Sequence, residues 1–314
     1  MVGLLAATSP PQWRLGALTK GFFIVLAKTS RDTQKGIIEA APETHLQKQI
    51  EVNLASGTED VPHQAVPVKL TGVRRPSPGI AELTFKVQRA RTFRFLAGQR
   101  AVLRAASGRT RALPIASCPC DGTTLRFLMS SHCADPLLRP ILAQWPDDTA
   151  RPHTQRFVLE GPEGDFVLSE NSPNPLVFVS QDEGFGAINS LLEHALNLEL
   201  GQPIFLLRLA SDKAHFFAHN FCRSLADAYD NLTYWQDTID PARDCGPGPY
   251  VAFATRTISR LSKLQAPFVY VSGSKEFCNA IQCVFEQGPV QAGRAVALSR
   301  PARAMAPRPS YSRR

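Results

Sequence analysis

The hydrophobic pattern changes character along the chain, from short alternating segments to longer segments with helical spacing. Between residues 66 and 168, apolar and polar positions alternate in short runs separated by glycine, proline, aspartate or serine, as in IAELTFKV at 80–87. About six such runs predict antiparallel strands that close into a barrel. One helical stretch, residues 136–145, interrupts them.

Residues 175–201 begin the second half and predict a strand, a glycine loop and a helix. Residues 176–179 are an apolar run typical of a buried strand, and Gly184 and Gly186 lie in the loop that follows. Apolar residues then recur on one helical face: Ile188, Leu191, Leu192, Ala195 and Leu196. A further apolar strand at 204–209 completes a βαβ unit, which implies a parallel sheet.

The remaining segments continue this alternation of strands and helices. They predict a single helix at 212–230, a strand at 232–235, an apolar strand at 267–273 and a helix at 275–288. The whole pattern predicts two domains, an antiparallel β-barrel followed by an α/β domain with a parallel sheet.

Charge and composition narrow the function classes. The 314 residues are 44% hydrophobic and 20% charged, as in an ordinary globular protein. The net charge of +8 is concentrated at the end, because residues 290–314 contain six arginines and no acidic residue. The rest is close to neutral, so we expect no nucleic-acid partner and interpret residues 290–314 as a basic disordered tail.

Cysteine usage and the apolar runs bear on location. No C-x-x-C pair occurs among the seven cysteines, which argues against a zinc ribbon and favours reduced thiols in a cytoplasmic protein. Cys118 and Cys120 are interpreted as small buried residues on one face of a strand. The histidines receive no role, and the apolar run at 21–27 is too short to be a transmembrane segment.

Five segments occur in a characteristic order between about residues 62 and 288. They are RFLAGQ at 94–99, RALPIAS at 111–117, GPEGDF at 161–166, DEGFGAINSLLEHAL at 182–196 and VYVSGSKEF at 269–277. Together they resemble the ferredoxin–NADP reductase-like flavoproteins, and in particular the subgroup with a ferredoxin fused ahead of the reductase. This resemblance implies an FAD-binding barrel and an NAD(P)-binding α/β domain.

The resemblance also implies site residues and a reaction. FAD would be bound by Arg111, Leu113, Pro114, Ile115, Ala116 and Ser117. NAD(P)H would be bound by Gly184, Phe185, Gly186, Gly273 and Ser274. The implied enzyme passes electrons from NAD(P)H through flavin to an electron-acceptor protein and needs no catalytic side chain, because the cofactors carry the chemistry.

The residue types on the flavin side leave alternatives open. The planar guanidinium of Arg111 suits a diphosphate, or it forms a solvated ion pair at the barrel rim. Leu113 would cover a ring face by dispersion, whereas Pro114 offers neither a hydroxyl nor an N–H. The backbone amides of residues 115–117 would meet the pyrimidine edge. Asp135 is a good helix N-cap but would repel phosphate.

Similar alternatives remain on the nucleotide side. Gly184 and Gly186 expose backbone N–H groups to a phosphate, or they only permit a tight turn. Asp182 and Glu183 suit the helix macrodipole but oppose a nearby pyrophosphate. Arg208 and Lys213 read a 2′-phosphate, or they are ordinary surface cations.

These observations predict four segments and two competing functions. Residues 62–170 form the FAD-binding barrel and residues 171–289 the NAD(P)-binding domain. Residues 1–61 are interpreted as the remnant of a lost ferredoxin module, and because no cysteine precedes Cys118 we expect no [2Fe–2S] cluster. The alternative to an oxidoreductase is a degenerate, non-catalytic flavoprotein scaffold that binds a partner.

Overall fold

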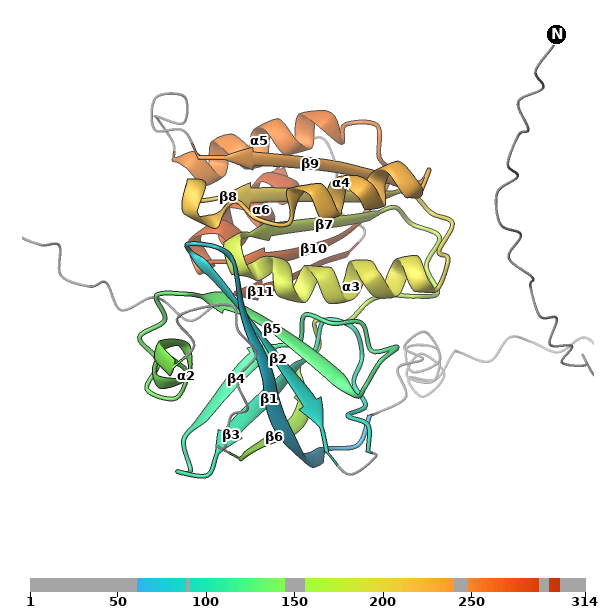
Figure 1. The fold of residues 1–314 in the computed structure, drawn as a ribbon. Helices are drawn as coiled ribbons and strands as arrows, with labels where there is room; N and C mark the ends of the chain where they lie inside the picture. Colours follow the sequence, from blue (N-terminus) through green and yellow to red (C-terminus); the bar gives the residue numbers. More distant parts are fainter. Residues whose placement is uncertain (1–60, 89–90, 145–155, 240–247, 288–293, 300–314) are drawn as a thin grey trace, which may run out of the picture. The chain divides into compact units, whose positions relative to one another are not determined.

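The computed structural model describes residues 61–88, 91–144, 156–239, 248–287 and 294–299 (Figure 1). Within these ranges the chain forms a six-stranded antiparallel sheet followed by a five-stranded parallel sheet with helices. This confirms the predicted fold class. The interpretation of residues 1–61 as a ferredoxin remnant lies almost entirely outside the described residues.

The first sheet is built from the alternating segments. Its strands are β1 (Gln64–Ser77), β2 (Ile80–Val87), β3 (Arg100–Ala105), β4 (Thr110–Pro114), β5 (Thr124–Ser130) and β6 (Phe157–Glu163), in the order β4-β3-β6-β1-β2-β5. The Ala116 N–H donates to Arg126 O at 2.7 Å, so the segment after β4 meets β5 and joins the two ends of the sheet. Inside, Phe85 makes edge contacts with Phe127 and Phe157, and all three are buried. Helix α2 (Leu138–Gln144) packs its apolar side on this core.

The second sheet contains β7 (Leu176–Gln181), β8 (Ile204–Ala210), β9 (Leu232–Thr238), β10 (Phe268–Gly273) and β11 (Arg294–Ser299), in the order β11-β10-β7-β8-β9. All its neighbouring strands are parallel. Helices α3 (Phe185–Asn197) and α4 (His219–Ala228) contribute to the core on one face, and α5 (Pro249–Arg260) and α6 (Lys275–Gln287) to the core on the other. No helix in the described ranges is long and apolar enough to cross a membrane.

Two local predictions were wrong, and one helix was missed. The single helix at 212–230 is instead a 3-10 turn, η2 (Lys213–His215), followed by α4, because Ala218 adopts a left-handed backbone with φ 53°. Helix α5 was not predicted. The tail prediction fails for residues 294–299, which form β11 in parallel register with β10, while 290–293 and 300–314 lie outside the described residues.

Helix α3 lies between the parallel sheet and barrel strand β5 (Figure 1). Its apolar residues, among them Leu191 and Leu192, are fully buried on the sheet side. Two of its polar residues bind the barrel and are not directed to solvent. Asn189 Nδ2 donates to Ala116 O at 2.9 Å, and Ser190 Oγ donates to Ser117 O at 2.8 Å. The helix therefore connects the two sheets through buried hydrogen bonds.

Candidate functional site

Strand β4 and residues 115–117 carry the predicted flavin residues, and they lie where the barrel meets α3. Ile115 is fully buried, and Ala116 and Ser117 are 2% and 6% exposed. The Ile115 N–H donates to Gln99 O at 3.0 Å, and the Ala116 N–H is used in the barrel closure. These two amides are already paired within the protein, so neither is available to a pyrimidine edge in this structure, and the role of the Ser117 amide stays a prediction.

Arg111 and Asp135 face each other at the barrel rim. Arg111 Nη1 lies 3.5 Å from Asp135 Oδ2, and Arg111 Nε is buried without a hydrogen-bond partner in the part of the chain that the structure describes. Asp135 Oδ1 accepts from the N–H groups of Leu137 and Leu138 at 2.9 and 3.2 Å, which confirms its role as a cap at the start of α2. The guanidinium therefore has unused donor capacity, but a carboxylate is already its neighbour.

Leu113 and Pro114 differ in what they offer to a ligand. Leu113 is 5% exposed and belongs to the buried barrel core, so little of its surface is available to cover a ring. Pro114 is half-buried at the end of β4, opposite Arg100 in the register. Of these two residues, the proline is therefore the more accessible to a ligand.

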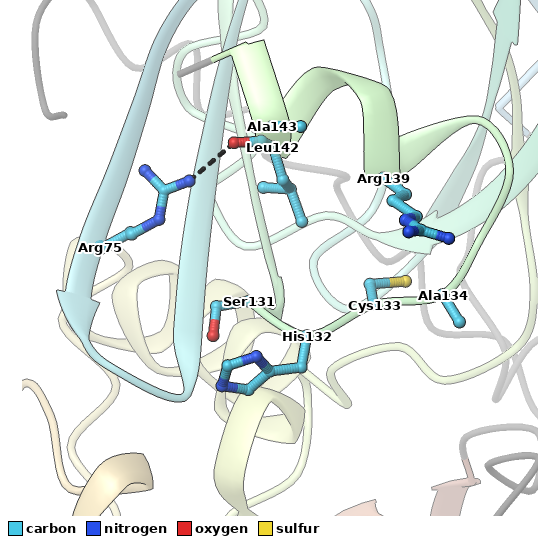
Figure 2. A pocket seen from close by; sticks show the side chains of 8 residues that line it. All are labelled: Arg75, Ser131, His132, Cys133, Ala134, Arg139, Leu142 and Ala143. Carbon is cyan, nitrogen blue, oxygen red and sulfur yellow. Dashed lines mark hydrogen bonds between the residues drawn. The ribbon is translucent and has the colours of Figure 1, made fainter. Parts of the chain in front are cut away.

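A pocket of about 410 Å³ opens beside α2, and the residues just before Asp135 form part of its wall. It is lined by Arg75, Ser131, His132, Cys133, Ala134, Arg139, Leu142 and Ala143. Figure 2 shows Arg75 and Arg139 on opposite sides, with Arg75 donating to Leu142 O at 2.8 Å. Its volume falls in the range of small-molecule sites. None of the predicted flavin residues at 111–117 lines it.

The predicted nucleotide glycines are required by close packing. A Cβ on Gly184 would collide with Ser272 O, and one on Gly273 would lie 2.6 Å from the Phe277 ring. A Cβ on Gly186 would lie 3.2 Å from Leu128 Cβ, across the contact between α3 and the barrel. Gly184 ends the 3-10 turn η1 (Asp182–Gly184), and Gly186 lies inside α3 and not in a loop.

Phe185 and Arg208 pack together in the interior. The guanidinium carbon of Arg208 lies 3.9 Å from the Phe185 ring centroid, a cation–π contact. Arg208 is 3% exposed and donates to Phe217 O at 2.7 Å. It is therefore a buried structural cation, so neither alternative stated for Arg208, a 2′-phosphate reader or an ordinary surface cation, is correct. Lys213 is exposed.

The carboxyl edge of the parallel sheet gathers polar groups from several elements. Gln181 Nε2 donates to Ser211 Oγ and to the Tyr250 hydroxyl, both at 2.9 Å, and Gln181 Oε1 accepts from the Ser274 N–H at 2.9 Å. Ligands of open α/β sheets bind at this edge. Ser274 Oγ in turn accepts from the Phe277 N–H at 3.2 Å, so it caps α6.

Asp182 lies at the same edge with a left-handed φ of 49°. Its carboxylate accepts from Ser211 N at 2.8 Å and from Ser211 Oγ at 2.6 Å. Burial raises the pKa of the Asp182 carboxyl above its ordinary value, and the Ser211 hydrogen bonds oppose this shift. The residue turns its charge inward toward Ser211.

Two expectations for Cys118 and Cys120 were wrong: that both are buried, and that their thiols are reduced. Cys118 is buried but Cys120 is exposed, and the structure joins them in a disulfide. Both sulfur atoms lie 3.8 Å from Nδ1 of His194, a residue of α3. This cluster could not be predicted from sequence spacing, because His194 lies more than seventy positions away from the cysteines.

Known proteins are similar to this chain at low sequence identity. No protein-family model matches the sequence. The chain is 26% identical over 142 residues to a probable flavin reductase of Photobacterium leiognathi, covering 45% of this chain and 59% of that protein. It is 23% identical over 129 residues to an NAD(P)H-flavin reductase of Vibrio harveyi, covering 41% and 54%. The aligned part thus spans little more than half the length of these relatives.

Solved structures show the fold. A ferredoxin reductase in carbazole 1,9a-dioxygenase superposes with a TM-score of 0.61 at 14% identity, covering 77% of this chain and 70% of that one. A ferredoxin NADP⁺ reductase from Neisseria gonorrhoeae with bound FAD and NADP gives 0.58 at 14% identity, covering 75% and 98%. The chain has the two-domain fold of the ferredoxin–NADP reductase-like flavoproteins, as its sequence motifs predicted.

Proposed function

We propose that this chain is an NAD(P)H-dependent flavin oxidoreductase that holds FAD where the barrel meets the α/β domain and passes electrons to an acceptor protein. The observation that carries the proposal is the direct connection between the two predicted sites. Residues 116 and 117, at the end of the predicted flavin segment, are hydrogen-bonded to Asn189 and Ser190 in the first turns of α3. A flavin on one segment would therefore lie near a nicotinamide on the other.

Arg111 is the residue of this chain best suited to a flavin phosphate. Its buried Nε has no hydrogen-bond partner among the described residues, and a guanidinium offers donors in a planar fork. Pro114 to Ser117 would set the shape of the surface beneath the ring. A bound flavin would supply hydride acceptance and single-electron release, so this chain needs only to bind and orient.

The nicotinamide nucleotide would approach the carboxyl edge of the parallel sheet. The contributing groups would be the backbone of Gly184, Phe185 and Gly186 at the start of α3, since the Phe185 side chain is buried, with Gly273 and Ser274 after β10. The hydrogen bonds of the Asp182 carboxylate support this, because the backbone N–H and the hydroxyl of Ser211 both donate to it and offset part of its repulsion of a pyrophosphate.

A non-catalytic scaffold remains the second candidate, and one observation favours it. The polar groups that would receive the cofactors are largely paired within the protein: Asp135 lies beside Arg111, and the amides of Ile115 and Ala116 bond to barrel carbonyls. A fold maintained only to bind a partner would show the same internal pairing.

Spectroscopy on the purified chain separates the two candidates. An oxidoreductase is expected to bind added FAD with a shifted visible spectrum and to bleach anaerobically when NADPH or NADH is supplied. Ferricyanide, a one-electron acceptor, should then restore the oxidised spectrum. Protein that neither binds FAD nor bleaches would contradict the proposal and favour the scaffold.

A further inference from the structure

A cluster of two sulfurs and one imidazole nitrogen lies at the junction of the two sheets, outside the proposed cofactor sites. Cys118 and Cys120 come from the barrel segment after β4, and His194 comes from α3. Their ligand atoms all lie within 4.8 Å of one another. We propose that Cys118, Cys120 and His194, with both cysteines reduced, form a binding site for a thiophilic divalent cation, Zn²⁺.

The distances suit this ion. In a tetrahedral zinc site, Zn–S bonds of about 2.3 Å and Zn–N bonds of about 2.05 Å separate sulfur from nitrogen by about 3.6 Å. Here both sulfurs lie 3.8 Å from His194 Nδ1. The Cα atoms of the two cysteines are 5.3 Å apart, so reduction leaves both thiols beside the same nitrogen.

Glu170 prepares His194 for this role. His194 Nε2 lies 2.9 Å from Glu170 Oε1, and an ionised carboxylate only accepts hydrogen bonds. In the tautomer that donates from Nε2 to this carboxylate, the lone pair of the ring is on Nδ1, facing the sulfurs. A carboxylate behind a ligating histidine is the usual arrangement in zinc proteins.

The surroundings stabilise thiolates and leave room for entry. Asn197 Nδ2 donates to the sulfurs of Cys118 and Cys120 at 3.2 and 3.4 Å, and the Cys120 N–H donates to Cys118 Sγ at 3.3 Å. Two thiolates and a neutral imidazole balance the charge of Zn²⁺. Cys120 is exposed, so the ion reaches the site from solvent and water completes the fourth position.

Cobalt titration of the full chain tests the site. A water-soluble phosphine reduces the disulfide to two thiols and is itself oxidised to the phosphine oxide, with oxygen and protons from water. The protein is then titrated with Co²⁺ under argon. We expect one equivalent to bind with thiolate-to-cobalt absorption in the near ultraviolet, and Zn²⁺ to displace it. Cys120→Ser should reduce this absorption by about half and weaken binding at least tenfold, whereas Cys283→Ser, at an exposed cysteine outside the cluster, should change neither.

His194→Gln and Glu170→Gln test the imidazole and its positioning residue. His194→Gln should weaken Co²⁺ binding at least tenfold, and Glu170→Gln should weaken it less while leaving the thiolate absorption at saturation unchanged. Circular dichroism of each variant shows whether it has folded, and the exposed Cys120 variant decides the outcome if His194→Gln has not. The proposal is overturned if the reduced chain shows no thiolate absorption, or if that absorption persists in Cys120→Ser and disappears in Cys283→Ser.

Discussion

Asp135 is expected to decide which flavins the chain accepts, because its carboxylate lies beside the one guanidinium assigned to a flavin phosphate. Arg111 Nη1 is 3.5 Å from Asp135 Oδ2, and the Asp135 side chain is only 13% exposed. Asp135→Asn removes the charge while keeping a side chain that caps α2 equally well. The variant therefore isolates the electrostatic effect from the fold.

The structure sets the size of the effect. A phosphate bound to Arg111 would lie about 5 Å from the Asp135 carboxylate, where two unit negative charges repel by about 0.8 kcal/mol in water and about 3 kcal/mol at an effective dielectric constant of 20. Removing this repulsion should raise FAD and FMN affinity by about 4-fold to about 100-fold. Riboflavin carries no phosphate, so its affinity should stay within about twofold.

Quenching of flavin fluorescence measures all three ligands on the same protein. Asp227→Asn, at an exposed position on α4, is the matched control and should change none of the affinities. Equal gains for riboflavin and FAD, or the same gain in the control, would show that the effect is not phosphate repulsion. No gain for FAD and FMN would refute the assignment of Arg111 to a phosphate.

Three further predictions concern stability, measured by urea unfolding. Burial raises the folded-state pKa of Asp182, so its charge destabilises the fold as pH rises from about 3.8 through that higher pKa. Asp182→Asn should therefore equal the parent protein in stability at acid pH and exceed it at pH 7. A stability difference that stays constant across pH would contradict this. Gly184→Ala should lower the free energy of unfolding by about 1–3 kcal/mol, because the added Cβ collides with Ser272 O. Gly201→Ala should cause no such loss, because nothing lies within 4 Å of a Cβ at that position. Equal losses in the two variants would count against the packing explanation. Glu193 accepts hydrogen bonds from Arg126 Nη2 at 2.7 Å and from Cys118 N at 3.1 Å. Glu193→Gln should therefore lower the free energy of unfolding by about 1–3 kcal/mol, and Glu199→Gln, at an exposed position, should lower it by almost nothing. A Glu193 variant as stable as the parent would show that these bonds add no net stability.

Much of the fold could be predicted because burial follows the period of each element. In β2 the alternation of IAELTFKV appears directly in the structure, with Leu83 and Phe85 fully buried. Strand β11 was missed because its arginine-rich setting outweighed the short apolar segment that pairs with β10. The predicted helix at 212–230 is interrupted at Ala218 because this one residue has a left-handed backbone conformation. Hydrophobic periodicity does not predict such a conformation.

The candidate site was less predictable, since its behaviour depends on contacts between distant residues. The alternatives for Asp135 were correctly stated, and the structure confirms the cap. The inward position of Arg208 and the meeting of Cys118 with His194 arise only when the sheets pack together. Residue type alone suggested an exposed cation and an inert thiol.

The buried hydrogen bonds of α3 restrict how the molecule can move. Asn189 is 4% exposed and Ser190 is fully buried, and both donate to carbonyls across the junction. Swinging the barrel away from the α/β domain would leave these groups without partners in the interior of the contact. The two domains should therefore unfold in one cooperative transition. The acceptor protein proposed above would have to receive electrons at the exposed surface of the junction, without the domains separating.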